Sequence, residues 1–76
     1  MAADLKPSME EILRIAIERE ADSFEYYYRA AMAADEPELR ALLLDLAEME
    51  KEHSARLRAE LSRLEIRHWL EAAVTC

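Results

Sequence analysis

One short stretch interrupts a chain that otherwise consists almost entirely of helix-forming residues: Asp35-Glu36-Pro37-Glu38. Asp35 and Glu38 have the spacing of a capping box, and proline is tolerated in the first turn of a helix, where backbone amides lack partners. We therefore expect one helix to end near Ala33 and another to begin near residue 36. A connection this short makes the two helices antiparallel neighbours.

The rest of the composition also indicates an all-α fold in one domain that covers residues 1–76. Glycine is absent, and strong helix formers dominate the chain. Ser8 and Glu11 form a second capping-box signal, which predicts a first helix over about residues 8–33. The second helix is expected over about residues 36–64. After Leu64 the apolar residues move to nearly the opposite side, so residues 65–74 form either a bent continuation or a short third helix.

Size and charge limit the classes of function. A domain of fewer than roughly 80 residues usually needs disulfides, a metal or oligomerisation for stability, and the single Cys76 excludes a disulfide within the chain. The formal net charge of −7 argues against a nucleic-acid partner, which needs a basic surface. The sequence has no apolar run of about 18 residues and no apolar signal core before Pro7. We therefore expect a cytoplasmic protein without a membrane span.

Each predicted helix has an apolar stripe that polar residues interrupt. In the first helix, Glu20 lies within the stripe formed by Met9, Leu13, Ala16, Ile17, Phe24, Tyr27 and Ala31. In the second helix, Glu50 and His53 lie within the stripe formed by Leu39, Leu43, Leu46, Leu57, Leu61 and Leu64. Glu50 and His53 are three residues apart, so both side chains can reach one metal ion.

The level along the hairpin predicts that these three side chains meet. In an antiparallel pair, residues lie opposite each other when their numbers are symmetric about the turn. Glu20 and Glu50 average to residue 35, and Glu20 and His53 average to a position between 36 and 37, which is where the turn is expected. At 1.5 Å per residue, all three lie about 20–25 Å from the turn.

One hairpin supplies two carboxylates and one imidazole, which is half the ligand set of a four-helix di-iron site. Two hairpins related by a two-fold axis would complete that set, and this is the commonest symmetry of oligomers. The alternative is an inert helical dimer in which the buried Glu and His pair with each other or with arginine. Tyr27 lies two turns after Glu20 and is either a core residue or a hydrogen-bond donor to a ligating carboxylate.

A second Glu-x-x-His sequence, Glu65-Ile66-Arg67-His68, does not pass the same test. Its opposite positions fall near residues 4 to 8, before the apolar stripe of the first helix. We therefore interpret Glu65 and His68 as surface residues.

Two stretches of the chain resemble a known family. Residues 16–27, with Glu20 and Tyr27, resemble the first helix of rubrerythrin-type ferritin-like proteins, and residues 46–53, with Glu50 and His53, resemble their second. Residues 35–39 are similar to the usual connection, so the likeness covers about residues 10 to 62. The resemblance implies a ferritin-like four-helix bundle, a di-iron centre with Glu20, Glu50 and His53 as ligands, and Tyr27 hydrogen-bonded beside them.

In length the chain is similar to encapsulated ferritins, whose di-iron centre forms between two subunits. That resemblance implies a homodimer, further assembly into rings, and an encapsulin shell around the protein. Three features differ from the relatives. The lone Cys76 cannot hold a rubredoxin iron centre, no shell-targeting tail follows Trp69, and Arg19 stands where a carboxylate is expected.

The function expected from the sequence is ferroxidase activity, the oxidation of Fe(II) to Fe(III) for iron storage or detoxification. Hard carboxylates with one imidazole suit iron, with manganese as the alternative metal. Two other functions are consistent with the sequence. The first is peroxide reduction with an external electron donor, and the second is a metal-free helical dimerisation module.

Overall fold

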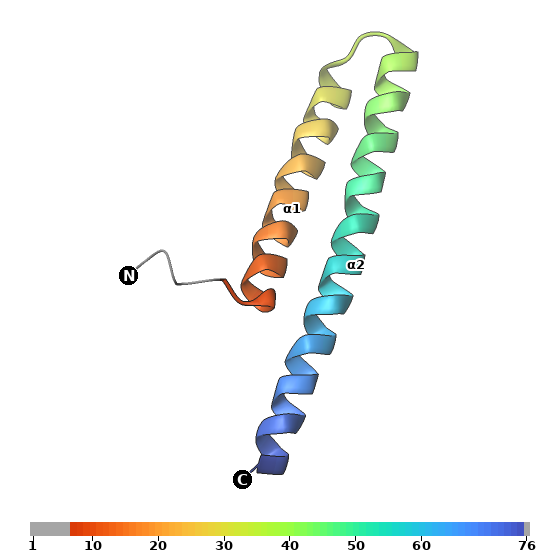
Figure 1. Ribbon diagram of the computed structural model, residues 1–76. Coiled ribbons are helices and arrows are strands. Elements are labelled where there is room, and N and C mark those ends of the chain that lie inside the picture. The colour runs from red at the N-terminus through yellow and green to blue at the C-terminus, as the bar shows by residue number, and fades with distance from the viewer. Residues whose placement is uncertain (1–6, 76) are drawn as a thin grey trace, which may run out of the picture.

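The computed structural model describes residues 7–75, which form two long helices side by side in an antiparallel hairpin (Figure 1). Helix α1 covers Met9–Ala33 and helix α2 covers Pro37–Thr75. The described residues contain no strand. The prediction of an all-α hairpin is therefore confirmed. No helix within residues 7–75 is long and apolar enough to cross a membrane.

Helix α1 begins at the predicted cap. The Ser8 hydroxyl accepts a hydrogen bond from the Glu11 amide at 3.1 Å, and Glu10 and Glu11 place negative charge in the first turn. The cap satisfies a free backbone amide, and the negative charges interact favourably with the positive end of the helix dipole, so both stabilise the start of α1. The reciprocal bond of a capping box, from the Ser8 amide to the Glu11 side chain, is not formed, so only half of the predicted box is present.

Helix α2 begins differently from the sequence prediction. Its first residue is Pro37, and the Arg40 amide donates to the Glu36 carbonyl at 2.9 Å. The cap position is therefore Glu36, and among the described residues the Asp35 side chain forms no capping bond. The expected Asp35–Glu38 box was wrong by one residue, because the proline ring already holds the backbone angle of a first helical turn.

Arg40 closes the other side of the connection. Its Nε donates to the Ala31 carbonyl at 3.1 Å, and its Nη2 donates to the Ala34 carbonyl at 2.8 Å. The last carbonyls of a helix have no partner within that helix, and a cation there also opposes the negative end of the dipole. One side chain of α2 thus caps the end of α1 and fixes the angle at which the hairpin turns.

Helix α2 is 39 residues long and α1 is 25, so the end of α2 projects beyond the start of α1 (Figure 1). Residues 65–74 continue α2 without interruption. Of the two alternatives that the sequence left open, the structure therefore has the continuation and not a third helix.

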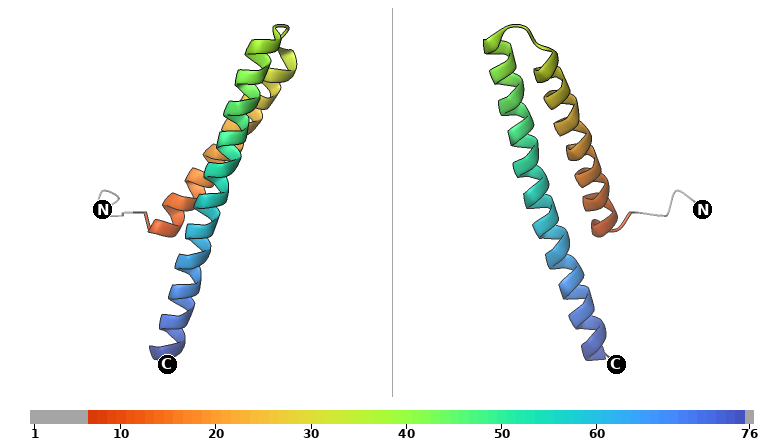
Figure 2. Two further views of the ribbon diagram at one scale, coloured as in Figure 1. Left: turned by 90° about the vertical axis from the view of Figure 1, so that its right-hand side faces the viewer. Right: turned by 180° about the vertical axis from the view of Figure 1, so that it is seen from behind.

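The helices pack closely through three alanines and one isoleucine, and they cross at an angle (Figure 2). Ala31 and Ala47 are 0% and 2% exposed, and Ile17 and Ala34 are also buried. Larger apolar residues of the predicted stripes are covered only in part, and the large apolar side chains that stay exposed include Met9, Leu39, Leu42 and Met49. One face of the hairpin is therefore an uncovered apolar surface, which we call the open face.

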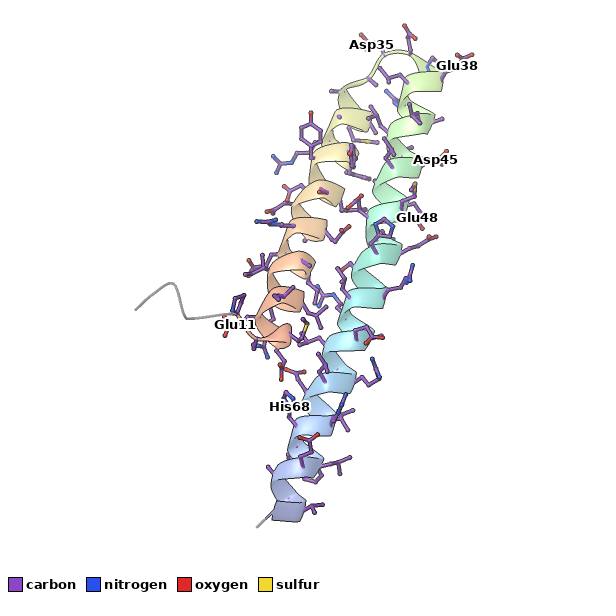
Figure 3. The ribbon with its side chains drawn as sticks, in the orientation of Figure 1. Glu11, Asp35, Glu38, Asp45, Glu48 and His68 are labelled. Atoms are coloured by element: carbon purple, nitrogen blue, oxygen red, sulfur yellow. The ribbon has the colours of Figure 1, made fainter. Side chains whose placement is uncertain are left out.

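At the end of the hairpin away from the turn, the two helices are joined by an ion pair and by a contact between a histidine and a carboxylate. Arg14 Nη2 lies 2.8 Å from Glu65 Oε2, and His68 contacts the Glu10 carboxylate. Figure 3 shows His68 on α2 near the first turns of α1. The predicted opposite positions, residues 4 to 8, were wrong, because the helices cross and their alignment drifts with distance from the turn. Glu65 and His68 are surface-exposed, as expected, but they connect the two helices.

We expect Arg40→Ala to lower the free energy of unfolding by about 1–3 kcal/mol, because two charge-assisted hydrogen bonds to helix-end carbonyls are lost. Chemical denaturation of the metal-free protein measures this change. Arg58→Ala is the matched control, since among residues 7–75 Arg58 bonds only to Ser54, which lies on the surface of the same helix. Equal effects of the two substitutions would contradict the capping role.

Candidate metal centre

The two helices bring three potential metal ligands to one place on the open face. Glu20 comes from the middle of α1, and Glu50 and His53 come from successive turns of α2. Each carboxylate follows a buried residue by three positions, Ile17 in α1 and Ala47 in α2. Residues three apart lie on the same side of a helix, so the tightly packed seam places both carboxylates beside it.

One ligand atom from each of Glu20, Glu50 and His53 lies within 4.8 Å of the other two. His53 Nδ1 is 3.5 Å from Glu20 Oε2. These three are the residues that the sequence selected from its two stripes, and the structure brings all of them together. Within residues 7–75 no other group of three such side chains meets this distance criterion.

Glu20 is the residue whose environment most clearly calls for a cation. Its Oε2 atom is buried and accepts no hydrogen bond within the described part of the chain. A buried carboxylate oxygen without a donor is costly, whereas a metal ion would satisfy it directly. Two carboxylates and an imidazole are also the donor types that iron and manganese accept. The residues present therefore fit the iron that ferritin-like sites hold.

The pKa of Glu50 is affected by the nearby carboxylate of Glu20. The pKa of its carboxyl is raised above the ordinary value of 4.5, first by a hydrogen bond to Glu20 that needs the proton, then by burial and by the charge of Glu20. His53 acts in the opposite direction and lowers this pKa. In the metal-free chain, the closeness of the two carboxylates thus favours the protonated form of Glu50.

The site is open on one side. A groove of about 480 Å³ is lined by Glu20, His53, Arg56, Leu57, Ala59 and Glu60. The His53 side chain is 47% exposed at this groove, whereas the Glu20 side chain is 23% exposed. A single hairpin therefore presents its ligands to the outside, at the open face where apolar residues are also uncovered.

Tyr27 is half-buried in α1, with its ring edge-on to Tyr26 at 5.6 Å between centroids. Within the described residues its hydroxyl forms no hydrogen bond, so the proposed bond to a ligating carboxylate is absent from the single chain. The sequence also did not indicate Arg56 and Glu60. They follow His53 by three and seven residues, which is the helical spacing that could have identified them.

The sequence model of the rubrerythrin family matches residues 3–72. The chain belongs to the rubrerythrin family. The match covers all of α1, α2 as far as residue 72, and all three potential ligands. The searches of curated proteins and of solved structures find no match.

Membership of the rubrerythrin family makes this a ferritin-like protein of the di-iron type, and it agrees with the Glu and His side chains found together on the hairpin. Iron binding and an oxidoreductase type of activity follow from the family. The chain has one cysteine, so it cannot itself hold an iron centre that needs paired cysteines.

The pH dependence of stability tests the crowded carboxylates. A group whose pKa is raised by folding stabilises the folded state below its ordinary pKa, and this contribution is lost as the pH rises through the raised value. We expect the free energy of unfolding of the metal-free protein to fall as the pH rises from about 4.5, and Glu50→Gln to remove this fall. Denaturant titrations between about pH 4 and about pH 8 measure both profiles.

Glu52→Gln is the control for this experiment, because Glu52 is an exposed glutamate on another side of α2. Its profile should follow that of the unsubstituted protein. If Glu50→Gln and Glu52→Gln had the same profile, the raised pKa of Glu50 would have no effect on folding.

Proposed function

We propose that this protein is a di-iron ferroxidase whose site forms between two copies of the chain, and that it oxidises Fe(II) to Fe(III) in iron storage or detoxification. The observation that supports this most directly is the incomplete ligand set of one hairpin. Two carboxylates and one imidazole lie together on an open apolar face, which is half of what a four-helix di-iron site uses.

A homodimer would both cover the exposed apolar residues and complete the set of metal ligands. A second hairpin on the open face would cover the apolar residues Met9, Leu39, Leu42 and Met49, and it would bring its own Glu20, Glu50 and His53 to the same place. A two-fold axis through the site makes the two sets equivalent, so each chain gives and receives the same contacts. We propose that the cytoplasm, or an encapsulin compartment within it, is where this dimer works.

The three side chains have different positions and therefore different roles. His53 lies at the groove and is the most exposed, so it would be the first ligand that an entering cation meets. Glu20 offers the buried oxygen that lacks a hydrogen-bond donor, and it would hold the cation more deeply. Glu50 has a raised pKa, and it would bind the cation in its deprotonated form, as metal ligands do.

Iron, the substrate, supplies the electron in this reaction as Fe(II) becomes Fe(III), and oxygen accepts it. The protein contributes four carboxylates and two imidazoles per dimer, which stabilise the higher charge of the oxidised ion. The carboxylates lose their mutual repulsion at the same time. Manganese has similar ligand preferences and is the competing metal.

Peroxide reduction is the second candidate, and the match to the rubrerythrin family favours it. It would use the same ligands but would need electrons from an external donor. We expect Fe(II) oxidation under air without any reductase. Rapid consumption of peroxide with a reductase present, together with slow Fe(II) oxidation under air, would instead assign the protein to this second activity.

Substitution of the ligands tests the leading proposal. We expect Glu50→Ala or His53→Ala to lower the rate of Fe(II) oxidation by more than ~100-fold, since even groups beside a metal ligand commonly change activity ~10–100-fold. The absorbance of Fe(III) measures the rate, and elemental analysis of the same samples measures bound iron. Both readings should fall together.

Glu18→Ala is the control, because Glu18 is an exposed residue outside the site on the same helix as Glu20. It should leave oxidation nearly unchanged. Equal losses in all three variants would contradict the assignment of the ligands. Purified protein that binds no iron or manganese, yet keeps its dimeric mass, would instead indicate the metal-free dimerisation module.

A further inference from the structure

The groove beside the metal centre contains a positive charge that has no partner. Arg56 lines this groove together with Glu20 and His53, and its side chain is exposed. It follows His53 by three residues, which places both side chains on one side of α2. Within residues 7–75 the Arg56 side chain forms no hydrogen bond, ion pair or ring contact. Its charge is therefore not neutralised by a neighbouring side chain.

The glutamates closest to Arg56 along α2 do not neutralise it. Glu60 lies one turn after Arg56 and also lines the groove, but its carboxylate forms an ion pair with Arg63. Glu52 lies one turn before Arg56, outside the groove lining, and in the described part of the chain it does not pair with Arg56 either. Arg56 thus contributes a net positive charge to the wall of the groove.

A bound iron ion would leave this positive charge without a counterion. The carboxylates of Glu20 and Glu50 carry two negative charges per chain, which balance the charge of Fe(II). Oxidation to Fe(III) adds a further positive charge, so the occupied site becomes positive even before Arg56 is counted. Cβ atoms three residues apart in a helix are about 5–6 Å from each other, so the guanidinium lies on the order of 10 Å from an ion held by His53, which is about one Debye length at ~0.1 M salt.

From these observations we propose that Arg56 determines how tightly the site holds iron, and that its charge favours release of the oxidised product. Repulsion between Arg56 and the ion rises in proportion to the charge of the ion, so Arg56 weakens the binding of Fe(III) more than that of Fe(II). An enzyme that oxidises iron for storage needs this order, because each Fe(III) ion must leave before the next Fe(II) ion is oxidised. The inference rests on the proposed function, since it treats iron as a substrate.

The proposed dimer would strengthen the effect of Arg56. The groove lies at the open face, so a second hairpin would cover part of it and exclude water and salt from the space between the guanidinium and the ion. Charges that are partly buried are screened much less than exposed ones. The two-fold axis would also place an equivalent Arg56 beside the second iron, so both halves of the site would be affected equally.

An ion pair across the dimer is the competing role for Arg56. In that role the guanidinium would bind a carboxylate of the second hairpin and help to hold the two chains together. Its removal would then weaken dimerisation and, with it, the binding of metal between the chains. The two roles therefore predict opposite changes in metal affinity when the charge is removed.

Titration of the full-length, metal-free protein with Mn(II) measures the affinity without any turnover, since Mn(II) has similar ligand preferences to iron. We expect Arg56→Gln to bind Mn(II) about three- to tenfold more tightly, because a positive charge roughly 10 Å away is removed. Arg56→Lys keeps the charge and should bind as the unsubstituted protein does. Added salt should reduce the difference between Arg56→Gln and the unsubstituted protein, which a change in packing alone would not do.

Arg58→Gln is the matched control, because it removes the same charge two residues away. Arg58 does not line the groove, and its guanidinium donates to Ser54 on the surface of α2. Its Mn(II) affinity should stay close to that of the unsubstituted protein. Equal affinities of Arg56→Gln and Arg58→Gln would overturn the proposal. Weaker binding by Arg56→Gln would overturn it as well and would indicate the ion pair across the dimer.

Removal of Fe(III) by a chelator tests the release of the oxidised product. After a single loading with Fe(II) in air, a strong Fe(III) chelator should take iron from Arg56→Gln about tenfold more slowly than from the unsubstituted protein. Arg58→Gln should lose its iron at the unsubstituted rate, and the absorbance of the ferric chelate measures all three rates. Equal rates in the three proteins would overturn the role of Arg56 in release.

The same samples separate failure of this inference from failure of the proposed function. Fe(II) oxidation together with unchanged Mn(II) affinity in Arg56→Gln would overturn the role of Arg56 and leave the ferroxidase standing. Tighter Mn(II) binding by Arg56→Gln in a protein that does not oxidise Fe(II) would leave the effect of Arg56 on affinity standing and contradict the ferroxidase. Absence of metal binding from every variant would contradict both.

Discussion

The main constraint on this structure is the closeness of two carboxylates, Glu20 and Glu50, beside the interface between the two helices. Glu20 and Glu50 each follow a buried residue by one turn, Ile17 in α1 and Ala47 in α2, which places both carboxylates beside the packed interface. The buried oxygen of Glu20 has no hydrogen-bond donor within the described residues. The closeness of Glu20 raises the pKa of the Glu50 carboxyl, together with burial. A hairpin built only for stability would place apolar residues here, since unpaired buried charges are costly. The arrangement makes sense for a protein that binds cations.

The proposal of a second hairpin follows from the same geometry. The ligands lie at the open face, beside a groove and among apolar side chains that a hairpin of two helices cannot cover. Burial of the exposed apolar surface would favour association with a second hairpin, and neutralisation of the crowded carboxylates would favour metal binding. Both act at the same place, so association and metal binding would reinforce each other by linkage.

Much of this could be predicted from the sequence because the rise of an α-helix is fixed. Once the turn is placed near Pro37, the meeting of Glu20 with Glu50 and His53 follows from counting residues. Counting fails further from the turn, where the crossing of the helices shifts the alignment and brings Glu10 and Arg14 to His68 and Glu65. The start of α2 was predicted to within about one residue, but its cap is Glu36 and not Asp35. The capping of α1 by Arg40 was missed, since it depends on contacts across the turn.

Arg40 has a further consequence for the order in which the chain folds. Its two hydrogen bonds join residues only nine and six positions apart, whereas the contact between Glu20 and His53 joins residues 33 positions apart. Small loops close in roughly 10–100 ns, and longer ones carry a larger entropic cost. The helices would begin to pair at the turn, and the carboxylates of Glu20 and Glu50 would come together only late in folding. The repulsion between Glu20 and Glu50 would therefore have little effect on the rate at which the hairpin forms.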